Sequence, residues 1–174
     1  GKIPAETLAE VRTFIYERYR NQLINDHDRN AVEAVIALTP PLHQVAERVR
    51  AAAAFAQLPE AASLAAANKR IGNLLKKAEG EIGTVNDAAL VEPAEKALAA
   101  AIAALRPQAE AQRAAGDFAA NLRTLAQARE PVDAFFADIM VMADDPAVRA
   151  NRLALLGQLH TLMNQVADIS RLAQ

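Results

Sequence analysis

Apolar residues recur along most of the chain at steps of three and four positions, which places them on one face of an α-helix. The clearest stripe follows Pro131 and consists of Val132, Phe135, Phe136, Ile139, Met142 and Ala143. No stretch alternates between apolar and polar residues over the length of a β-strand, and no repeat of fixed period is visible. The pattern therefore predicts an all-α protein.

Prolines and capping residues divide the periodic stretches into about eight helices with short connections, which is the organisation of an α-helical bundle. The helices should begin after Pro4, after Asp26 or Asp28, at Pro40 with Thr39 as N-cap, near Pro59, near Pro93, after Asp117, at Pro131 and at Pro146. Pro107 should interrupt the fifth helix, and the eighth should be the longest and run to the C-terminus. We expect residues 1–174 to form one domain, with a subdivision left open near residues 80–92, the least regular segment.

The composition agrees with a helical bundle. Alanine supplies 42 of the 174 residues, against 6 glycines and 4% aromatics, and alanine loses no side-chain entropy in a helix. The chain has no cysteine, which fits a cytoplasmic protein, and no apolar run approaches the about 18 residues that suggest a membrane span. Because the chain opens on Gly1 and not on methionine, we expect it to be a fragment of a longer subunit.

Tests for catalytic chemistry find little. His27 and Asp28 form a pair of the kind that metal-dependent phosphohydrolases use, but His43 and His160 lie in unrelated contexts, and a solvated histidine beside a capping aspartate explains the pair better. The motifs GxxxxGK[ST], GxGxxG and GxSxG are absent. We therefore expect no catalytic residue, no metal site and no cofactor within this chain.

The densest group of basic residues lies in "LAAANKRIGNLLKKA", residues 64–78, on the side of the helix opposite its apolar face. They are Lys69 and Lys76, with Asn73 between them, and Arg70 and Lys77 in a second row. Cations and amides on a rigid helix suit a phosphate backbone, but a solvated helix face explains them equally well. The net charge of −2 argues against nucleic-acid binding through the whole surface, so any such binding must use a local patch.

A second polar cluster opens the last helix, in "MVMADDPAVRANRLALL". Arg152 falls within the apolar stripe of this helix, so its guanidinium needs a carboxylate or carbonyl partner. The candidate carboxylates are Asp133, Asp138 and Asp144. Spacing favours an ion pair for Arg152, whereas for Arg149 and Asn151 it leaves a structural role and anion binding at the helix N-terminus both open.

The first helix carries Leu8, Val11, Ile15, Tyr19 and Gln22 on one face. Nearby, tyrosines lie among arginines, a combination that can stack RNA bases. The residues concerned are Tyr16, Tyr19 and Arg20, beside Arg12 and Arg18. Amphipathic edge residues with hydroxyls at the rim are the favoured interpretation.

Several stretches resemble a known family. "PVDAFFADIMVMADDPAVRANRLALLGQLHTLMNQVADISRL" (131–172) closely resembles the C-terminus of bacterial glycyl-tRNA synthetase β subunits. "LPEAASLAAANKRIGNLLKKA", "EPAEKALAAAI" and "FIYERYRNQL" resemble the same subunits further upstream, so the resemblance covers nearly the whole chain. "RANRLALL" is also similar to the helix shared by anticodon-binding domains of the DALR type, as in arginyl-tRNA synthetase.

The resemblance implies a helical anticodon-binding domain that does no chemistry of its own. In this family the α subunit holds the aminoacylation site for glycine and ATP, with Mg, and the β subunit is needed to bind tRNA; the two form a heterotetramer. The implied partners are tRNA-Gly, the remainder of the β subunit and the α subunit. The alternative is a structural bundle that docks onto the rest of the synthetase.

The genetic code sharpens this expectation. Glycine codons are GGN, so the anticodons share cytosine at their second and third positions. In a single-stranded loop, cytosine offers an amine donor together with N3 and O2 acceptors, which carboxylates, cations and amides can satisfy. The residues expected to contact RNA are Lys69, Arg70, Asn73, Lys76, Lys77, Arg149, Asn151 and Arg152.

Overall fold

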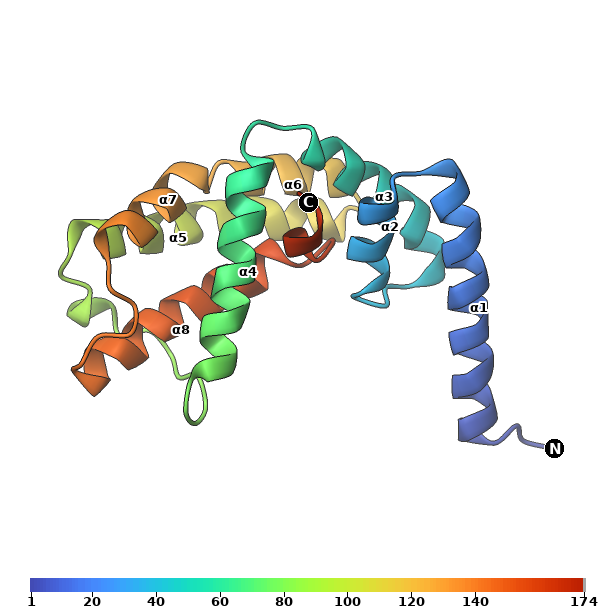
Figure 1. Ribbon diagram of the computed structural model, residues 1–174, viewed down its shortest axis with the longest axis horizontal. Coiled ribbons are helices and arrows are strands. Elements are labelled where there is room, and N and C mark those ends of the chain that lie inside the picture. Colours follow the sequence, from blue (N-terminus) through green and yellow to red (C-terminus); the bar gives the residue numbers. More distant parts are fainter. Residues whose placement is uncertain (174) are drawn as a thin grey trace.

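The computed structural model describes residues 1–173, and within them it contains eight α-helices, two short 3-10 helices and no strand (Figure 1). The elements are α1 (Ala5–Asp26), α2 (Arg29–Ile36), α3 (Leu42–Ala56), α4 (Ala61–Lys77), η1 (Asp87–Ala89), α5 (Pro93–Ala114), α6 (Phe118–Ala126), α7 (Arg129–Asp138), α8 (Pro146–Met163) and η2 (Ile169–Arg171). The predicted all-α fold of about eight helices is confirmed.

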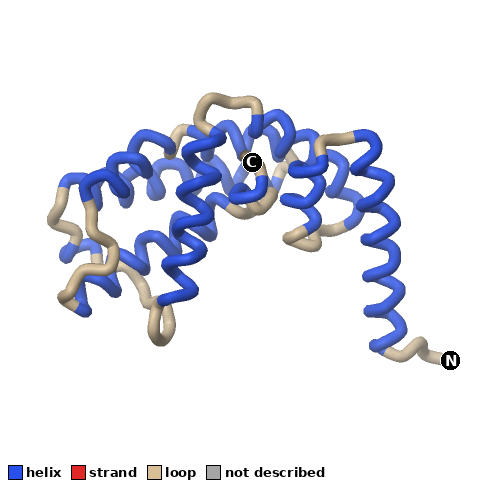
Figure 2. The backbone as a smooth tube through the Cα atoms, viewed as in Figure 1, coloured by secondary structure: helices blue, strands red, loops and turns tan. Residues whose placement is uncertain are grey.

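The helices α2 to α8 contribute side chains to one hydrophobic core. α4 packs across α8, α5 packs against α6, α7 and α8, and α2 and α3 pack on each other (Figure 1). Buried side chains on both sides of residues 80–92 belong to one hydrophobic cluster; Leu64 and Leu98, for example, are both fully buried. α1 differs from the other helices, because its N-terminal half extends away from the bundle (Figure 2).

Short-range capping fixes several helix starts where the sequence predicts them. Asp28 accepts a hydrogen bond from the Asn30 backbone N–H at 2.9 Å, and Asp117 and Asp145 begin α6 and α8 in the same way. The predicted N-cap at Thr39 is wrong, since α3 begins at Leu42. Thr39 and Pro40 both precede a proline, which disfavours the helical conformation, so the helix starts only after the second proline.

Pro107 does not interrupt α5, contrary to the prediction. The helix runs unbroken from Pro93 to Ala114. A proline inside a helix leaves the carbonyl four residues earlier without its partner, and here that carbonyl belongs to Ala103. Both Pro107 and Ala103 are exposed, so water can bind the freed carbonyl.

The last two helices are shorter than predicted, and α8, with 18 residues, is not the longest helix, because α1 and α5 have 22 residues each. α7 ends at Asp138, before Met142 and Ala143 of the apolar stripe. α8 ends at Met163, and the chain then turns back, where the Asp168 N–H donates to the Ala34 carbonyl at 2.8 Å. This backbone bond to α2 replaces a bond that a longer helix would make, so α8 does not reach the C-terminus.

Candidate nucleic-acid interface

The outer face of α4 carries the basic residues predicted from the sequence. Leu64 and Ile71 on the inner face are fully buried, which turns the opposite face to solvent. Lys69, Arg70, Asn73, Lys76 and Lys77 are all exposed. Among residues 1–173, none of the four cations in this group lies within 4.0 Å of a carboxylate oxygen. Their charge is therefore available to a partner.

Arg70 is held toward α7. Its guanidinium carbon lies 4.5 Å from the centre of the Phe136 ring, a cation–π contact, and Phe136 packs edge-on against the buried Phe135. The contact orients the guanidinium without neutralising it. Arg70 and Lys77 thus lie on the α7 side of the helix, whereas Lys69 and Lys76 lie on the other side.

A first hollow, of about 570 Å³, lies on the Lys69 side of α4. Its polar lining includes Lys69, Lys76, His160, Asp168 and Arg171. Asp168 already accepts hydrogen bonds from Ser170 and from Arg171, whose Nε lies 3.0 Å from its Oδ2. Burial lowers the pKa of His160 despite the opposing effect of Asp168, so the imidazole is neutral at pH 7. The two lysines leave this hollow positive.

A second hollow, of about 450 Å³, lies at the end of α4 beside the start of α8. It is lined by Lys77, Glu79, Glu81 and Arg149, among others. Arg149 is half-buried and donates from Nη1 to the Ala143 carbonyl at 2.8 Å. The fold therefore joins one cation from each of the two predicted basic clusters, Lys77 and Arg149, in one hollow. The two exposed glutamates add hydrogen-bond acceptors to these donors.

Arg152 is bound within the protein. Its Nε lies 3.0 Å from Oε2 of Glu95 on α5, and its Nη1 donates to the Met140 carbonyl at 2.7 Å. The sequence correctly predicts an ion pair for Arg152, but the proposed partners Asp133, Asp138 and Asp144 are wrong. Because the Met140 and Ala143 carbonyls accept bonds from Arg152 and Arg149, the segment after α7 is stabilised as a turn and not as a longer helix.

Asn151 is buried and bonds the segment before α5. Its Nδ2 donates to the Asn86 carbonyl at 3.1 Å, and its Oδ1 accepts from the Asn86 N–H at 2.8 Å. Such a reciprocal pair satisfies both backbone groups of Asn86, which would otherwise lack partners. The polar cluster at the start of α8 is thus mainly structural.

Comparison with known families identifies the domain. Residues 64–169, which make up more than half of the chain, match the model described as "DALR anticodon binding domain". The chain belongs to the DALR anticodon-binding domain family. The matched stretch of the DALR domain includes most of α4 and all of α8, and hence the residues of both hollows except the flanking Ala37, Leu38, Ser170 and Arg171.

Three similar proteins carry the description "Glycine--tRNA ligase beta subunit". The chain is 52% identical to the protein of Leptothrix cholodnii, 53% to that of Thiobacillus denitrificans and 52% to that of Janthinobacterium sp. (strain Marseille). These matches cover 99%, 94% and 98% of this chain but 26%, 24% and 25% of the relatives. The chain thus spans about a quarter of the length of these relatives.

Tyr16 and Arg20 of α1, which lie outside the DALR match, hold this helix to its neighbours. The Tyr16 hydroxyl donates to the Pro40 carbonyl, and Arg20 pairs with Glu33 of α2. The Arg20 hydrogen bond holds the pKa of Glu33 below its ordinary value. These contacts favour the interpretation of Tyr16 and Arg20 as edge residues over base stacking.

Two further features are the His27–Asp28 pair and the apolarity of the helices. Asp28 caps α2, and no group of three metal-ligating side chains occurs among residues 1–173. No helix in the same range has the length and apolarity required to cross a membrane.

Sequence reasoning missed three residues that line the first hollow of the DALR domain. His160, Asp168 and Arg171 come from the end of α8 and from the turn after it, about 90 to 100 positions after Lys69. No local pattern connects them with α4, and only the packing of α4 on α8 and η2 brings them together.

Proposed function

We propose that this chain binds the anticodon loop of tRNA-Gly as the anticodon-binding domain of a glycyl-tRNA synthetase β subunit. Aminoacylation then takes place elsewhere in the enzyme, with the α subunit supplying the site for glycine, ATP and Mg. The observation that carries the proposal is the position of the free α4 cations, which lie inside the stretch that matches the DALR domain. The description of the relatives supports glycine as the amino acid, and translation implies the cytoplasm.

Lys69 and Lys76 are the proposed phosphate contacts. They lie seven residues apart, two helical turns or about 10 Å along α4, so they contact successive phosphates of an extended strand more readily than a single one. Arg70 contributes from the other side of the helix, where its contact with Phe136 fixes its direction before RNA binds. Asn73 lies between the two rows and adds an amide.

The second hollow suits a cytosine. A cytosine has one amine donor and two acceptors on its pairing edge, so it needs both an acceptor and donors from the protein. Glu79 or Glu81 accepts from the amine, and Lys77 and Arg149 donate to O2 and N3. A carboxylate rejects uracil, which has an acceptor where cytosine has its amine.

Asn151 and Arg152 leave the set of proposed RNA contacts, because their hydrogen bonds hold the domain together. The retained contacts are Lys69, Arg70, Asn73, Lys76, Lys77 and Arg149.

The decisive experiment reverses Lys69→Glu and Lys76→Glu together in the complete αβ enzyme and measures tRNA-Gly binding against salt concentration. The matched control reverses Lys96→Glu and Arg123→Glu, which are exposed on α5 and α6 and change the net charge equally. We expect a loss of about tenfold or more in affinity for the α4 variant, and a salt slope shallower by roughly 1.4, because two phosphate contacts are lost.

The control variant should keep both the affinity and the slope. Equal losses in the two variants would mean that only the total charge matters, and unchanged binding in the α4 variant would remove α4 from the interface. Circular dichroism of both variants checks that the helices remain folded.

A further inference from the structure

The first half of α1 has no packing partner among residues 1–173. Every residue from Gly1 to Ile15 is exposed. The large apolar side chains among them are Ile3, Leu8, Val11, Phe14 and Ile15, which keep 60%, 50%, 48%, 62% and 42% of their surface in contact with solvent. Scattered exposed apolar residues are ordinary, but five within thirteen consecutive positions form a patch of the kind that marks an interaction site.

The patch has the geometry of a helix-packing surface. Leu8, Val11 and Ile15 follow one another at steps of three and four, so they form one stripe along the helix. We call these three residues the α1 stripe. Toward the C-terminus the same face continues with Tyr19 and Leu23, which pack against the core, while Tyr16 on the adjoining side donates to Pro40. The α1 stripe therefore prolongs a face that packs on the bundle in the second half of α1 and is exposed in the first half.

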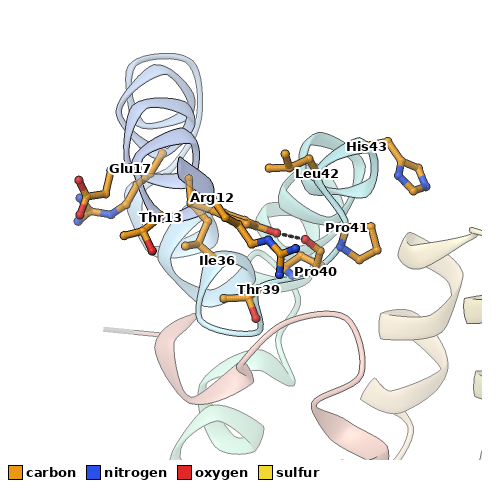
Figure 3. Close-up of a pocket in the computed structure, with 11 residues that line it drawn as sticks. Arg12, Thr13, Glu17, Ile36, Thr39, Pro40, Pro41, Leu42 and His43 are labelled. Carbon is orange, nitrogen blue, oxygen red and sulfur yellow. Dashed lines mark hydrogen bonds between the residues drawn. The ribbon is translucent and has the colours of Figure 1, made fainter. Parts of the chain in front are cut away.

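The bundle side of α1 is also loosely packed. A groove of about 860 Å³ separates this helix from the start of α3, and Figure 3 shows Arg12 on one side of it and Leu42 on the other. Residues 5–15 thus make little contact with the other residues that the structure describes. Most helix stability in proteins comes from the packing of an apolar face, and this half of α1 has no such packing, so it is the part of the helix that a partner would stabilise most.

More polypeptide of the same subunit is available as the partner of this surface. The chain covers only 26% of the length of its Leptothrix cholodnii relative, so about three quarters of such a subunit lies outside it. A second copy of this chain suits the α1 stripe poorly, because Arg12 and Arg18 flank the stripe while Glu6, Glu10 and Glu17 lie on the opposite side. Two such surfaces would bring arginines together along both edges.

We propose that the α1 stripe packs against a part of the β-subunit polypeptide that lies outside these 174 residues, and that this contact positions the DALR domain relative to the rest of the subunit. The surface that receives the stripe is apolar with an acidic rim, which complements Arg12 and Arg18. The proposal rests on the assignment of the chain to a longer β subunit, but not on tRNA binding, since α1 lies outside the DALR match.

Photo-crosslinking in the complete αβ enzyme identifies the occupant. The photoreactive amino acid p-benzoylphenylalanine replaces Val11, and the matched control carries it in place of Glu10, on the other side of the helix. We expect Val11 to cross-link to a peptide of the same β polypeptide outside this chain, and Glu10 not to cross-link there. A Val11 product with the α subunit or with a second β subunit would overturn the proposal.

Hydrogen–deuterium exchange then tests the energetics. In the complete enzyme the amides of residues 8–15 should exchange about tenfold or more slowly than in the 174-residue chain, because the contact suppresses local unfolding. Val11→Asp together with Ile15→Asp should restore fast exchange there, whereas Glu10→Asp with Glu17→Asp introduces the same poor helix former and should not. Fast exchange of residues 8–15 in the unmodified enzyme would overturn the proposal. Because tRNA binding is measured in parallel, failure of the α1 contact can be told apart from failure of the proposed RNA interface.

Discussion

Arg152 of α8 and Glu95 of α5 form an ion pair between two helices, with Nε 3.0 Å from Oε2. The Glu95 side chain is 2% exposed and that of Arg152 is 13% exposed. The other oxygen of Glu95 accepts from the Glu92 backbone N–H at 3.0 Å, as part of the capping box that begins α5. One carboxylate therefore both caps α5 and holds the guanidinium of Arg152, which in turn donates to the Met140 carbonyl.

Replacing Arg152→Ala should destabilise the domain by about 3 kcal/mol, because removal of one partner leaves Glu95 as a buried charge without a counter-ion. Urea unfolding of the 174-residue chain measures the change. The matched control is Arg129→Ala, which breaks the exposed Arg129–Asp133 pair and should cost less than about 1 kcal/mol. If Arg152 instead served RNA directly, its removal would lower tRNA affinity at unchanged stability.

The sequence predicted the parts of the fold that depend on neighbouring residues. Helix number and type follow from apolar periodicity, and the starts at Asp28, Asp117 and Asp145 follow from caps that act over two or three residues. The helix ends were less predictable, because they depend on distant partners. α5 continues through Pro107 because that position faces water, and exposure is a property of the folded bundle.

The candidate site likewise has features that the local sequence predicts and others that depend on distant residues. The exposed face of α4 was predictable from the helical period alone, since Leu64 and Ile71 define its buried side. The partner of Arg152 was not, because Glu95 lies 57 positions away and several aspartates lay closer in sequence. For the same reason Lys77 and Arg149 could be named separately, but not placed in one hollow.

Acid should weaken the contact between α1 and α2. The Arg20 hydrogen bond lowers the pKa of Glu33 in the folded protein, so the ionised carboxylate stabilises the fold above the ordinary glutamate pKa of about 4.3. This contribution disappears as the pH falls through the lowered pKa. The free energy of unfolding should therefore fall more between pH 7 and pH 3 in the unmodified chain than in the Glu33→Gln variant.

Unfolding measured at several pH values tests this expectation. Glu47→Gln is the control, because Glu47 and Arg50 are well exposed and their closest atoms are 3.8 Å apart. The Glu47 variant should follow the pH dependence of the unmodified chain. Parallel curves for the unmodified chain and Glu33→Gln would contradict the assigned role of the Arg20–Glu33 pair.

Gly72 in the middle of α4 limits helix stability without serving a turn. A Cβ atom at this position would lie 3.8 Å from Nε2 of His160, an ordinary contact distance. Gly72→Ala should therefore stabilise the chain by roughly 0.5–1 kcal/mol, because alanine loses less backbone entropy on folding. Gly157→Ala in α8 should gain less, since its Cβ would lie 3.2 Å from Cγ2 of Ile82. Thermal unfolding of the two variants, side by side, gives the comparison, and a larger gain at Gly157 would contradict it.

Base selection by the second hollow provides the sharpest chemical test of the proposed function. The ionised carboxylates of Glu79 and Glu81 accept hydrogen bonds but cannot donate them. They therefore favour the cytosine amine and disfavour the uracil carbonyl. Replacement of both by glutamine keeps their shape but adds amide donors. The variant enzyme should therefore discriminate less between tRNA-Gly and tRNA-Gly with uracil at the second or third anticodon position.

A good hydrogen-bonded base contact is worth about 1–3 kcal/mol of discrimination, so the ratio of the two affinities should fall by roughly tenfold or more. Competition binding to the complete enzyme measures this ratio directly. Lys77→Ala is the matched comparison. Loss of this cation should weaken the binding of both tRNAs. Because Lys77 donates to O2, which cytosine and uracil share, its loss should leave the ratio of the two affinities unchanged. The glutamine variant lacks both carboxylates, so any selectivity that persists must come from other residues. An unchanged ratio of affinities would therefore show that the cytosines are recognised outside this hollow.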